Sequence, residues 1–189
     1  MSWKFDYWYL ENFLNAREVK SIGSFIEKNN EGLEKNSMGA YDGNIKSKKK
    51  TTTYVISWHQ LKSKLDKLED TINFYNERSF GYILYPFTQF NHSLLNVYDS
   101  NSAGEYDWHF DTSRSDIIDT KLTVIINLST GKYKGGDFFI FNGNSYKVKQ
   151  LDTPGNMVIF KSYLNHKVTR VTEGTRKSLT LFCSGPKFK

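Results

Sequence analysis

Residues 155–186 of the chain read GNMVIFKSYLNHKVTRVTEGTRKSLTLFCSGP. Two runs within this stretch, 155–160 and 176–184, are short and rich in β-branched and aromatic residues, and the turn residues TEGT stand before the second run. Runs of this composition, bounded by turn residues, are typical of β-strands. The stretch therefore predicts two strands near the C-terminal end of the chain.

Three further runs of this kind lie upstream, separated by turn residues: LLNVY (94–98), KLTVIINL (121–128) and GDFFIFNG (136–143). Many short strands at this spacing favour a β-sandwich or barrel. We expect a jelly roll, the double-stranded β-helix of cupin-like proteins, over about residues 80–186.

The segment from about residue 10 to residue 78 shows helical spacing instead. Asn15 and Glu18 match a capping box, which marks the start of a helix. The apolar residues that follow at helical intervals are Val19, Ile22, Phe25 and Ile26, and a second stripe holds Leu61, Leu65, Leu68, Ile72 and Tyr75. Residues 36–53 are polar and contain glycine, so we expect a loop there. The prediction is a single domain over residues 1–189, mainly β with supporting N-terminal helices (α+β).

The composition excludes several classes of protein. The chain has 189 residues, a formal net charge of +6 and one cysteine, Cys183. A lone cysteine rules out an internal disulfide framework and a thiolate metal cluster, and we expect Cys183 to be a buried small hydrophobe. The N-terminus lacks a signal-peptide pattern, and no apolar run is long enough to span a membrane, so we expect a cytoplasmic protein with no membrane partner. The oligomeric state stays open.

Part of the positive charge is gathered in the run from Lys46 to Lys50, inside the predicted loop. A solvated loop is favoured over a surface that binds phosphates, because arginines and exposed aromatic residues do not alternate as on single-strand platforms. A nucleic-acid partner is therefore disfavoured.

The sequence YDWHFDTS places His109 and Asp111 two residues apart. Side chains at positions i and i+2 of a strand leave the same face, so the imidazole and the carboxylate can bind one ion. His166 supplies a third candidate ligand. Two histidines and one carboxylate on one face of an octahedron form the triad of non-haem iron(II) oxygenases. We interpret His59 and His92 as structural or surface residues.

Arg176 follows His166 by ten residues. An always-charged, bidentate donor suits the far carboxylate of a dicarboxylate cosubstrate. Ser178, on the same strand face, adds a hydroxyl donor. Trp108 flanks the two ligands, and we expect it to point away from the metal and to pack in the core.

At this point the chain resembles a known family. The stretch VYDSNSAGEYDWHFD (97–111) is similar to the Y…G…Y…H-x-D signature of prolyl 4-hydroxylase-like 2-oxoglutarate/Fe(II) dioxygenases. KYKGGDFFI (132–140) resembles their Y-x-GG-[DE] strand. Residues 155–186 resemble their G…F…H-x-V…V-x-x-G-x-R-x-S block, especially in the bacterial and phage branch of PKHD-type hydroxylases. NFLNAREVKSIGSFIE (12–27) is similar to their helical N-terminus.

The resemblance implies His109, Asp111 and His166 as iron ligands and Arg176 as the partner of the 2-oxoglutarate C5 carboxylate. It also implies Fe(II), 2-oxoglutarate and O2 as cofactor and cosubstrates, with ascorbate as a reductant. Two more residues are candidates for binding the cosubstrate, Tyr98 and Asn127. Tyr98 is equally well read as a core tyrosine, and Asn127 stands where some members carry a cosubstrate-binding tyrosine. Gly135 and Gly136 are expected to serve backbone conformation.

The function implied is hydroxylation, with release of succinate and CO2, of a prolyl residue in a peptide or protein. Halogenases of this superfamily lack the carboxylate that Asp111 provides here. Free proline or another small molecule is an alternative substrate. A nucleic-acid dealkylase is less favoured, because Phe182 stands where that branch carries a second arginine. An inactive jelly-roll binding module would have lost a ligand or Arg176. The phage-like resemblance hints at a viral origin and thus at a host cytoplasm.

Overall fold

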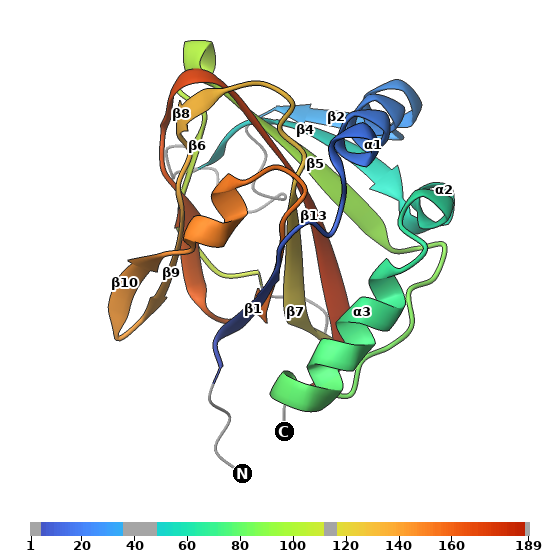
Figure 1. The fold of residues 1–189 in the computed structure, drawn as a ribbon. Coiled ribbons are helices and arrows are strands. Elements are labelled where there is room, and N and C mark those ends of the chain that lie inside the picture. The colour runs from blue at the N-terminus through green and yellow to red at the C-terminus, as the bar shows by residue number, and fades with distance from the viewer. Residues whose placement is uncertain (1–4, 36–48, 112–116, 188–189) are drawn as a thin grey trace.

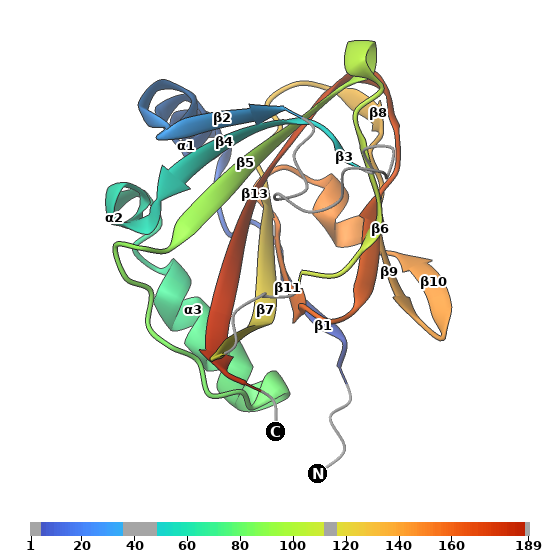
Figure 2. The same cartoon turned by 180° about the vertical axis from the view of Figure 1, so that it is seen from behind.

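The computed structural model of the chain describes residues 5–35, 49–111 and 117–187. Its main secondary structure is β-strand, arranged in two antiparallel sheets that face each other (Figures 1 and 2). The larger sheet contains, in spatial order, β1 (Tyr7–Leu10), β11 (Met157–Lys161), β7 (Ile118–Asn127), β13 (Val171–Pro186), β5 (His92–Asp99), β4 (Thr52–Ser57) and β2 (Gly32–Lys35). A short strand, β8 (Tyr133–Gly135), pairs with the first part of β13.

The smaller sheet contains, in spatial order, β10 (Asn144–Lys147), β9 (Phe138–Asn142), β12 (Asn165–Val168), β6 (Glu105–His109) and β3 (Lys49–Lys50). This arrangement confirms the predicted fold class, a mainly β protein with a jelly-roll core and few helices. The five predicted strands correspond to β5, β7, β9, β11 and β13.

Two apolar cores lie on opposite faces of the larger sheet, and β7 supplies both. Leu122, Val124 and Ile126 belong to the cluster that includes the helices, whereas Ile125 belongs to the cluster between the two sheets. This alternation follows from the two-residue period of a strand. It also turns the intervening polar residue, Thr123, toward the space between the sheets, where the candidate site lies.

The helices cover one face of the larger sheet (Figure 1). α1 (Ala16–Asn29) begins with the predicted capping box: Asn15 accepts from the backbone of Glu18 at 3.0 Å, and the Glu18 carboxylate accepts from the backbone of Asn15 at 2.7 Å. Its buried face contains Val19, Ile22 and Ile26, as the spacing predicts. Cys183 is buried in the same core, as expected.

The second predicted helix is broken into pieces. They are α2 (Trp58–Leu61), the 3-10 turn η1 (Lys62–Lys64), α3 (Leu68–Tyr75) and the π-helical turn η2 (Asn76–Phe80). The break falls at Leu65, whose backbone (φ −132°, ψ 45°) is not helical. Leu61, Leu65, Leu68 and Ile72 are nevertheless all buried, so the apolar stripe was read correctly although the helix is not continuous. Two further 3-10 turns are η3 (Ser100–Ser102) and η4 (Lys149–Asp152).

The predicted loop over residues 36–53 is partly wrong. Residues 36–48 lie outside the described residues, but residues 49–50 form β3, and β4 begins at Thr52. β4 pairs with β5 along its whole length, and β2 pairs with β4 in turn. The β-branched residues of TTYVIS suit a half-buried strand, and pairing with a distant strand decides their conformation. Within the described residues, no helix is long and apolar enough to cross a membrane.

Candidate metal and cosubstrate site

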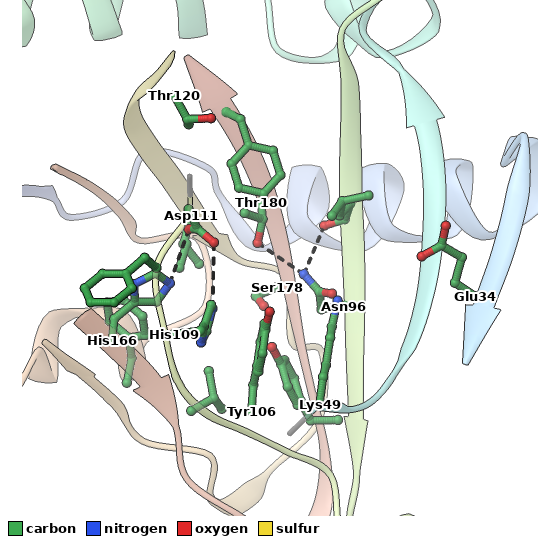
Figure 3. A pocket seen from close by; sticks show the side chains of 17 residues that line it. Glu34, Lys49, Asn96, Tyr106, His109, Asp111, Thr120, His166, Ser178 and Thr180 are labelled. Carbon is green, nitrogen blue, oxygen red and sulfur yellow. Dashed lines mark hydrogen bonds and ion pairs between the residues drawn. The ribbon is translucent and has the colours of Figure 1, made fainter. Parts of the chain in front are cut away.

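The two sheets bring His109, Asp111 and His166 together. His109 and His166 are directly opposite each other on β6 and β12, and their side chains meet Asp111 between the sheets (Figure 3). The Nε2 atom of His166 lies 3.2 Å from Asp111 Oδ2, and that of His109 lies 3.7 Å from Asp111 Oδ1. One ligand atom from each of the three residues fits within 4.8 Å of the others.

Asp111 reaches this position by a different route from the one that the sequence suggested. β6 ends at His109, so Asp111 is not on the strand. Its backbone N–H donates to the carbonyl of Ser162 at 3.0 Å, just after β11. The convergence of His109 and Asp111 therefore depends on a contact between distant segments, and strand alternation alone does not produce it.

Both imidazoles direct Nε2 toward the shared space. His109 Nδ1 lies 2.7 Å from the carbonyl oxygen of Asp107, and His166 Nδ1 lies 2.9 Å from that of Leu164. A carbonyl oxygen only accepts, so each Nδ1 carries the hydrogen, and in the neutral ring each Nε2 keeps its lone pair. Two nitrogen lone pairs and a carboxylate are a donor set that suits a divalent transition metal.

The electrostatics agree with a neutral His109, whereas at His166 the effect of burial is outweighed by Asp111, which raises the pKa of that imidazole. Burial, with the positive charge of a protonated His166 beside it, lowers the pKa of His109 to about 3. Burial alone would raise the pKa of Asp111, but His166, His109 and the Thr123 hydroxyl together outweigh it and lower the pKa below its usual value. At neutral pH the site therefore offers a carboxylate and a neutral His109.

A hydroxyl group on β7 orients the carboxylate of Asp111. The Thr123 hydroxyl donates to Asp111 Oδ2 at 2.9 Å and lies 3.0 Å from the hydroxyl of Ser162. Outer hydrogen bonds of this kind orient metal ligands and tune their affinity.

A β-bulge in β6 places a tyrosine against the site. His166 pairs with His109, but Val168 pairs with Tyr106, so three residues of β6 span the distance of two on β12. The extra residue turns Tyr106 to the same side as His109, and the two rings stack with their centroids 3.4 Å apart. Nothing in the sequence signals this bulge.

Trp108 lies in the bulged part of β6 and is not one of the residues that line the cavity, as expected. The predicted core packing is wrong. Trp108 is only half-buried and contacts Phe141 edge-on, while the Lys167 ammonium lies 4.6 Å from the centre of one of its rings. His59 and His92 are both exposed, in agreement with a surface role.

Arg176 is buried next to Ser178 and Tyr98, two residues that line the same cavity, and 1% of its surface is exposed. Its Nη1 donates to the Ser178 hydroxyl at 3.1 Å, and the guanidinium lies 5.4 Å from the centre of the Tyr98 ring. Among the residues that the structure describes, none accepts a hydrogen bond from Nη2. A buried guanidinium with an unsatisfied donor is costly unless an anion completes it, and a carboxylate fits that need.

Tyr98 stands directly opposite Arg176 in the sheet register. Burial raises the pKa of its phenol to about 12, so the hydroxyl stays protonated. It lines the cavity and can therefore donate to a bound ligand. The two interpretations of Tyr98, as a core residue and as a cosubstrate contact, are compatible in this position.

Gly135 and Gly136 occupy positions that favour glycine, and Gly136 lies against Arg176. Gly135 and Gly136 have φ of +72° and +67°, in the left-handed region that glycine tolerates, which agrees with their expected role in backbone conformation. A Cβ on Gly136 would lie 2.8 Å from Arg176 Cδ. The missing side chain of Gly136 thus makes room for the arginine.

Asn127 does not join the site. Its amide nitrogen donates to the carbonyls of Leu151 (2.9 Å) and Asp152 (3.2 Å) and to the Tyr133 hydroxyl (3.1 Å), and its amide oxygen accepts from the backbone of Ser129. It is fully buried and is not a cavity residue. The prediction that Asn127 binds cosubstrate is therefore withdrawn, because loop contacts use the whole amide.

A cavity of about 360 Å³ extends from the three candidate ligands. The smaller sheet contributes the histidines, and the larger sheet contributes a polar wall of which the sequence analysis identified only Ser178. The polar residues of this wall are Ser178, Asn96, Thr180 and Glu34, whereas Lys49 lines the cavity from β3 of the smaller sheet. The alternation of side chains along β5 and β13 could have predicted that Asn96 and Thr180 face the cavity. No local sequence pattern predicts this for Lys49 or Glu34.

Comparison with known proteins agrees with this geometry. Residues 93–184 match the family described as the 2OG-Fe(II) oxygenase superfamily. The chain contains a 2OG-Fe(II) oxygenase domain. The family implies Fe(II), 2-oxoglutarate and O2, and the oxygenase domain carries a matching His-Asp-His triad.

Solved structures resemble the chain in fold over most of its length. A prolyl-4-hydroxylase from Pseudomonas putida is 17% identical, with a TM-score of 0.71 and coverage of 95% of this chain and 92% of the other. The viral collagen prolyl hydroxylase of Paramecium Bursaria Chlorella virus-1, in complex with 2OG, is 15% identical (TM-score 0.67, coverage 96% and 97%). A prolyl hydroxylase from Trichoplax adhaerens, in complex with a hypoxia inducible factor peptide fragment, is 17% identical (TM-score 0.64, coverage 95% and 84%). The curated protein sequences gave no match.

Proposed function

We propose that the chain, acting as one domain over residues 1–189, is a 2-oxoglutarate-dependent Fe(II) hydroxylase of prolyl residues in a peptide or protein. The observation that supports it best is the pairing of two features across one region. The three candidate metal ligands line the cavity, and next to two other lining residues, Ser178 and Tyr98, lies the buried guanidinium of Arg176 with an unsatisfied donor. An elongated dicarboxylate that chelates a metal would use both.

Each residue has a role in this proposal. His109 and His166 bind Fe(II) through Nε2 and Asp111 binds it through its carboxylate, while Thr123 keeps that carboxylate oriented. Arg176 binds the far carboxylate of 2-oxoglutarate. Bound there, Fe(II) supplies the oxidative chemistry that consumes 2-oxoglutarate and O2, releases succinate and CO2 and transfers a hydroxyl group to the substrate.

Ser178 and Tyr98 act beside Arg176. Ser178 accepts from Nη1 and so turns Nη2 toward the cosubstrate, and the protonated Tyr98 hydroxyl donates to the same carboxylate. We expect Ser178→Ala to weaken 2-oxoglutarate binding less than the loss of Arg176, because the charge is retained.

The prolyl substrate is proposed from the fold of the neighbours. Three of them are prolyl hydroxylases, and one was solved with a peptide fragment. Phe182, a cavity residue, stands where nucleic-acid dealkylases of this superfamily carry a second arginine, so it does not favour that alternative.

The test is an anaerobic titration with Fe(II) and 2-oxoglutarate, followed by visible absorption. The wild type should develop a weak charge-transfer band, His109→Ala should lose it, and Arg176→Ala should need at least about tenfold more 2-oxoglutarate, since charged hydrogen bonds are at stake. His92→Ala and Arg170→Ala are matched controls at exposed positions and should behave like the wild type.

Absence of the band in folded, metal-loaded wild type would contradict the oxygenase proposal. The prolyl step is tested separately with proline-containing peptides, with and without ascorbate. A product that is heavier by one oxygen atom supports it, and turnover only with free proline would move the assignment to a small-molecule hydroxylase.

A further inference from the structure

Lys49 is a buried cation that faces the cavity. On β3, Lys49 pairs with Tyr106 and Lys50 pairs with Glu105, so the two lysine side chains leave opposite faces of the strand. Lys49 is 5% exposed, lines the cavity, and has its ammonium 5.4 Å from the centre of the Tyr106 ring. Lys50 instead forms an ion pair with Glu105 at 2.5 Å.

A directed chain of hydrogen bonds ends at the opposite wall. The Thr53 hydroxyl donates to the Asn96 amide oxygen at 3.0 Å. The Asn96 amide nitrogen donates to the Thr180 hydroxyl oxygen at 3.2 Å (Figure 3). An amide has one accepting and one donating end, so the order of this chain is fixed. Thr180 thus accepts from Asn96, and its own O–H remains to be donated toward the cavity that it lines.

Both groups therefore offer donors to one space. The Lys49 ammonium has three N–H donors and can hold a ligand alongside a protein partner. Although burial lowers the pKa of Lys49 to about 8, the ammonium stays mainly protonated at neutral pH. Donors that converge in a low-dielectric cavity favour an acceptor with negative charge.

The charged groups near Lys49 and Thr180 limit which ligand can bind there. Asp111 already belongs to the metal site, and Arg176 with Ser178 is used by the cosubstrate in the function proposed above. Thr180 lies two residues beyond Ser178 on β13, about 6 to 7 Å along the strand, and so outside the Arg176 contact. Glu34 also lines the cavity and is exposed, and its charge raises the pKa of Lys49 against the larger effect of burial. The net charge of +6 further favours an anionic partner.

We propose that Lys49 and Thr180 form an anion-binding subsite that holds a carboxylate of the substrate beside the hydroxylation site. The proposal rests on the hydroxylase function and names its substrate class: a prolyl compound with a carboxylate close to the ring. That carboxylate is either the free α-carboxylate of a terminal or free proline, or the side chain of a neighbouring acidic residue.

The experiment measures binding by calorimetry to the anaerobic protein loaded with Fe(II) and 2-oxoglutarate. Two matched pairs of probes distinguish the sources of the carboxylate: N-acetyl-glycyl-proline against its C-terminal amide, and amidated peptides with Pro-Glu against Pro-Gln. The protein variants are wild type, Lys49→Met, Thr180→Val and the matched control Lys50→Met, which removes the same charge on the other face of β3.

In the wild type the carboxylate member of at least one pair should bind about tenfold more tightly than its neutral partner. Lys49→Met should abolish this preference, Thr180→Val should reduce it, and Lys50→Met should retain it. The affinity for 2-oxoglutarate should be the same in all four proteins, which separates this subsite from the cosubstrate site.

Three results would overturn the subsite. They are equal binding of both members of each pair, a preference that survives in Lys49→Met, and a weakened affinity for 2-oxoglutarate in Lys49→Met, which would make Lys49 a cosubstrate residue. If the proposed hydroxylase function itself is wrong, the charge-transfer band of the iron complex will be missing before any probe is added. This result is distinguishable from the failure of the subsite alone.

Discussion

Tyr106 lies flat against the imidazole of His109, with ring centroids 3.4 Å apart and ring planes 12° apart. The bulge in β6 creates this contact, since a regular strand would direct side chains three residues apart to opposite faces. The ring of His166 is also near, with its centroid 4.1 Å away and its plane tilted by 55°. The candidate ligand His109 thus contacts two rings, and its Nδ1 donates to the backbone carbonyl of Asp107.

Tyr106→Ala should therefore weaken metal binding. Without the stacked ring, His109 gains rotational freedom that it must lose again on binding, and we expect affinity to fall about tenfold, as for other supporting residues of metal ligands. Tyr106→Phe keeps the stacking surface and should bind nearly as the wild type does. Titration with Co(II), read from its visible absorption, measures both. Equal loss in both variants would show that the hydroxyl, and not the ring, matters.

Thr123→Val should also lower metal affinity. The substitution keeps the shape of the side chain but removes the hydroxyl that donates to Asp111 Oδ2 at 2.9 Å. We expect a loss of between about tenfold and a hundredfold in Fe(II) affinity. Thr120→Val, a nearby cavity residue on the same strand, is the control and should change affinity little. An unchanged dissociation constant in Thr123→Val would mean that the backbone contact of Asp111 is enough to orient it.

Gly136→Ala should raise the requirement for 2-oxoglutarate. The new Cβ would lie 2.8 Å from Arg176 Cδ at a φ of +67°, so the arginine must move. We expect the 2-oxoglutarate dissociation constant to rise about tenfold, because a shifted guanidinium loses a charged hydrogen bond. Gly143→Ala has a similar positive φ but meets no atom within 4 Å, and it controls for backbone strain alone. Equal 2-oxoglutarate affinity in the two variants would contradict the argument.

Lys49→Met should stabilise the fold. Burial lowers the pKa of Lys49 to about 8, which means that the folded state disfavours the ammonium relative to the unfolded chain. The gain in the free energy of unfolding, on the order of 1 kcal/mol, should be fully present below about pH 8 and should vanish as pH rises toward the ordinary lysine pKa of about 10.4. Denaturant unfolding at several pH values measures it, with Lys50→Met as control. A destabilised Lys49→Met would show that its partners in the fold outweigh the cost of burial.

Some features of this protein can be derived from local sequence alone. The capping box of Asn15 and Glu18 and the five strand runs act through neighbouring residues, so their patterns are visible without a fold. The candidate ligands and Arg176 were also found this way, because few side chains have the chemistry that a metal and a dicarboxylate need.

Other features depend on segments that are far apart in the chain. Asp111 is positioned by Ser162, the amide of Asn127 is used by the loop at Leu151 and Asp152, and the helix through Leu65 breaks although its apolar spacing continues. No periodicity within one segment contains this information, because each outcome depends on which partner a hydrogen bond or a core position finds.

The set of polar residues that line the cavity also depends on pairing between distant segments. Residues 49–53 read as loop, yet the pairing of β3 with β6 and of β4 with β5 turns Lys49 and Thr53 inward. Local sequence thus identified the chemistry of the site, since that depends on residue type and short spacing. Tertiary structure decided which other groups face the metal, because strand register sets the face on which each side chain emerges.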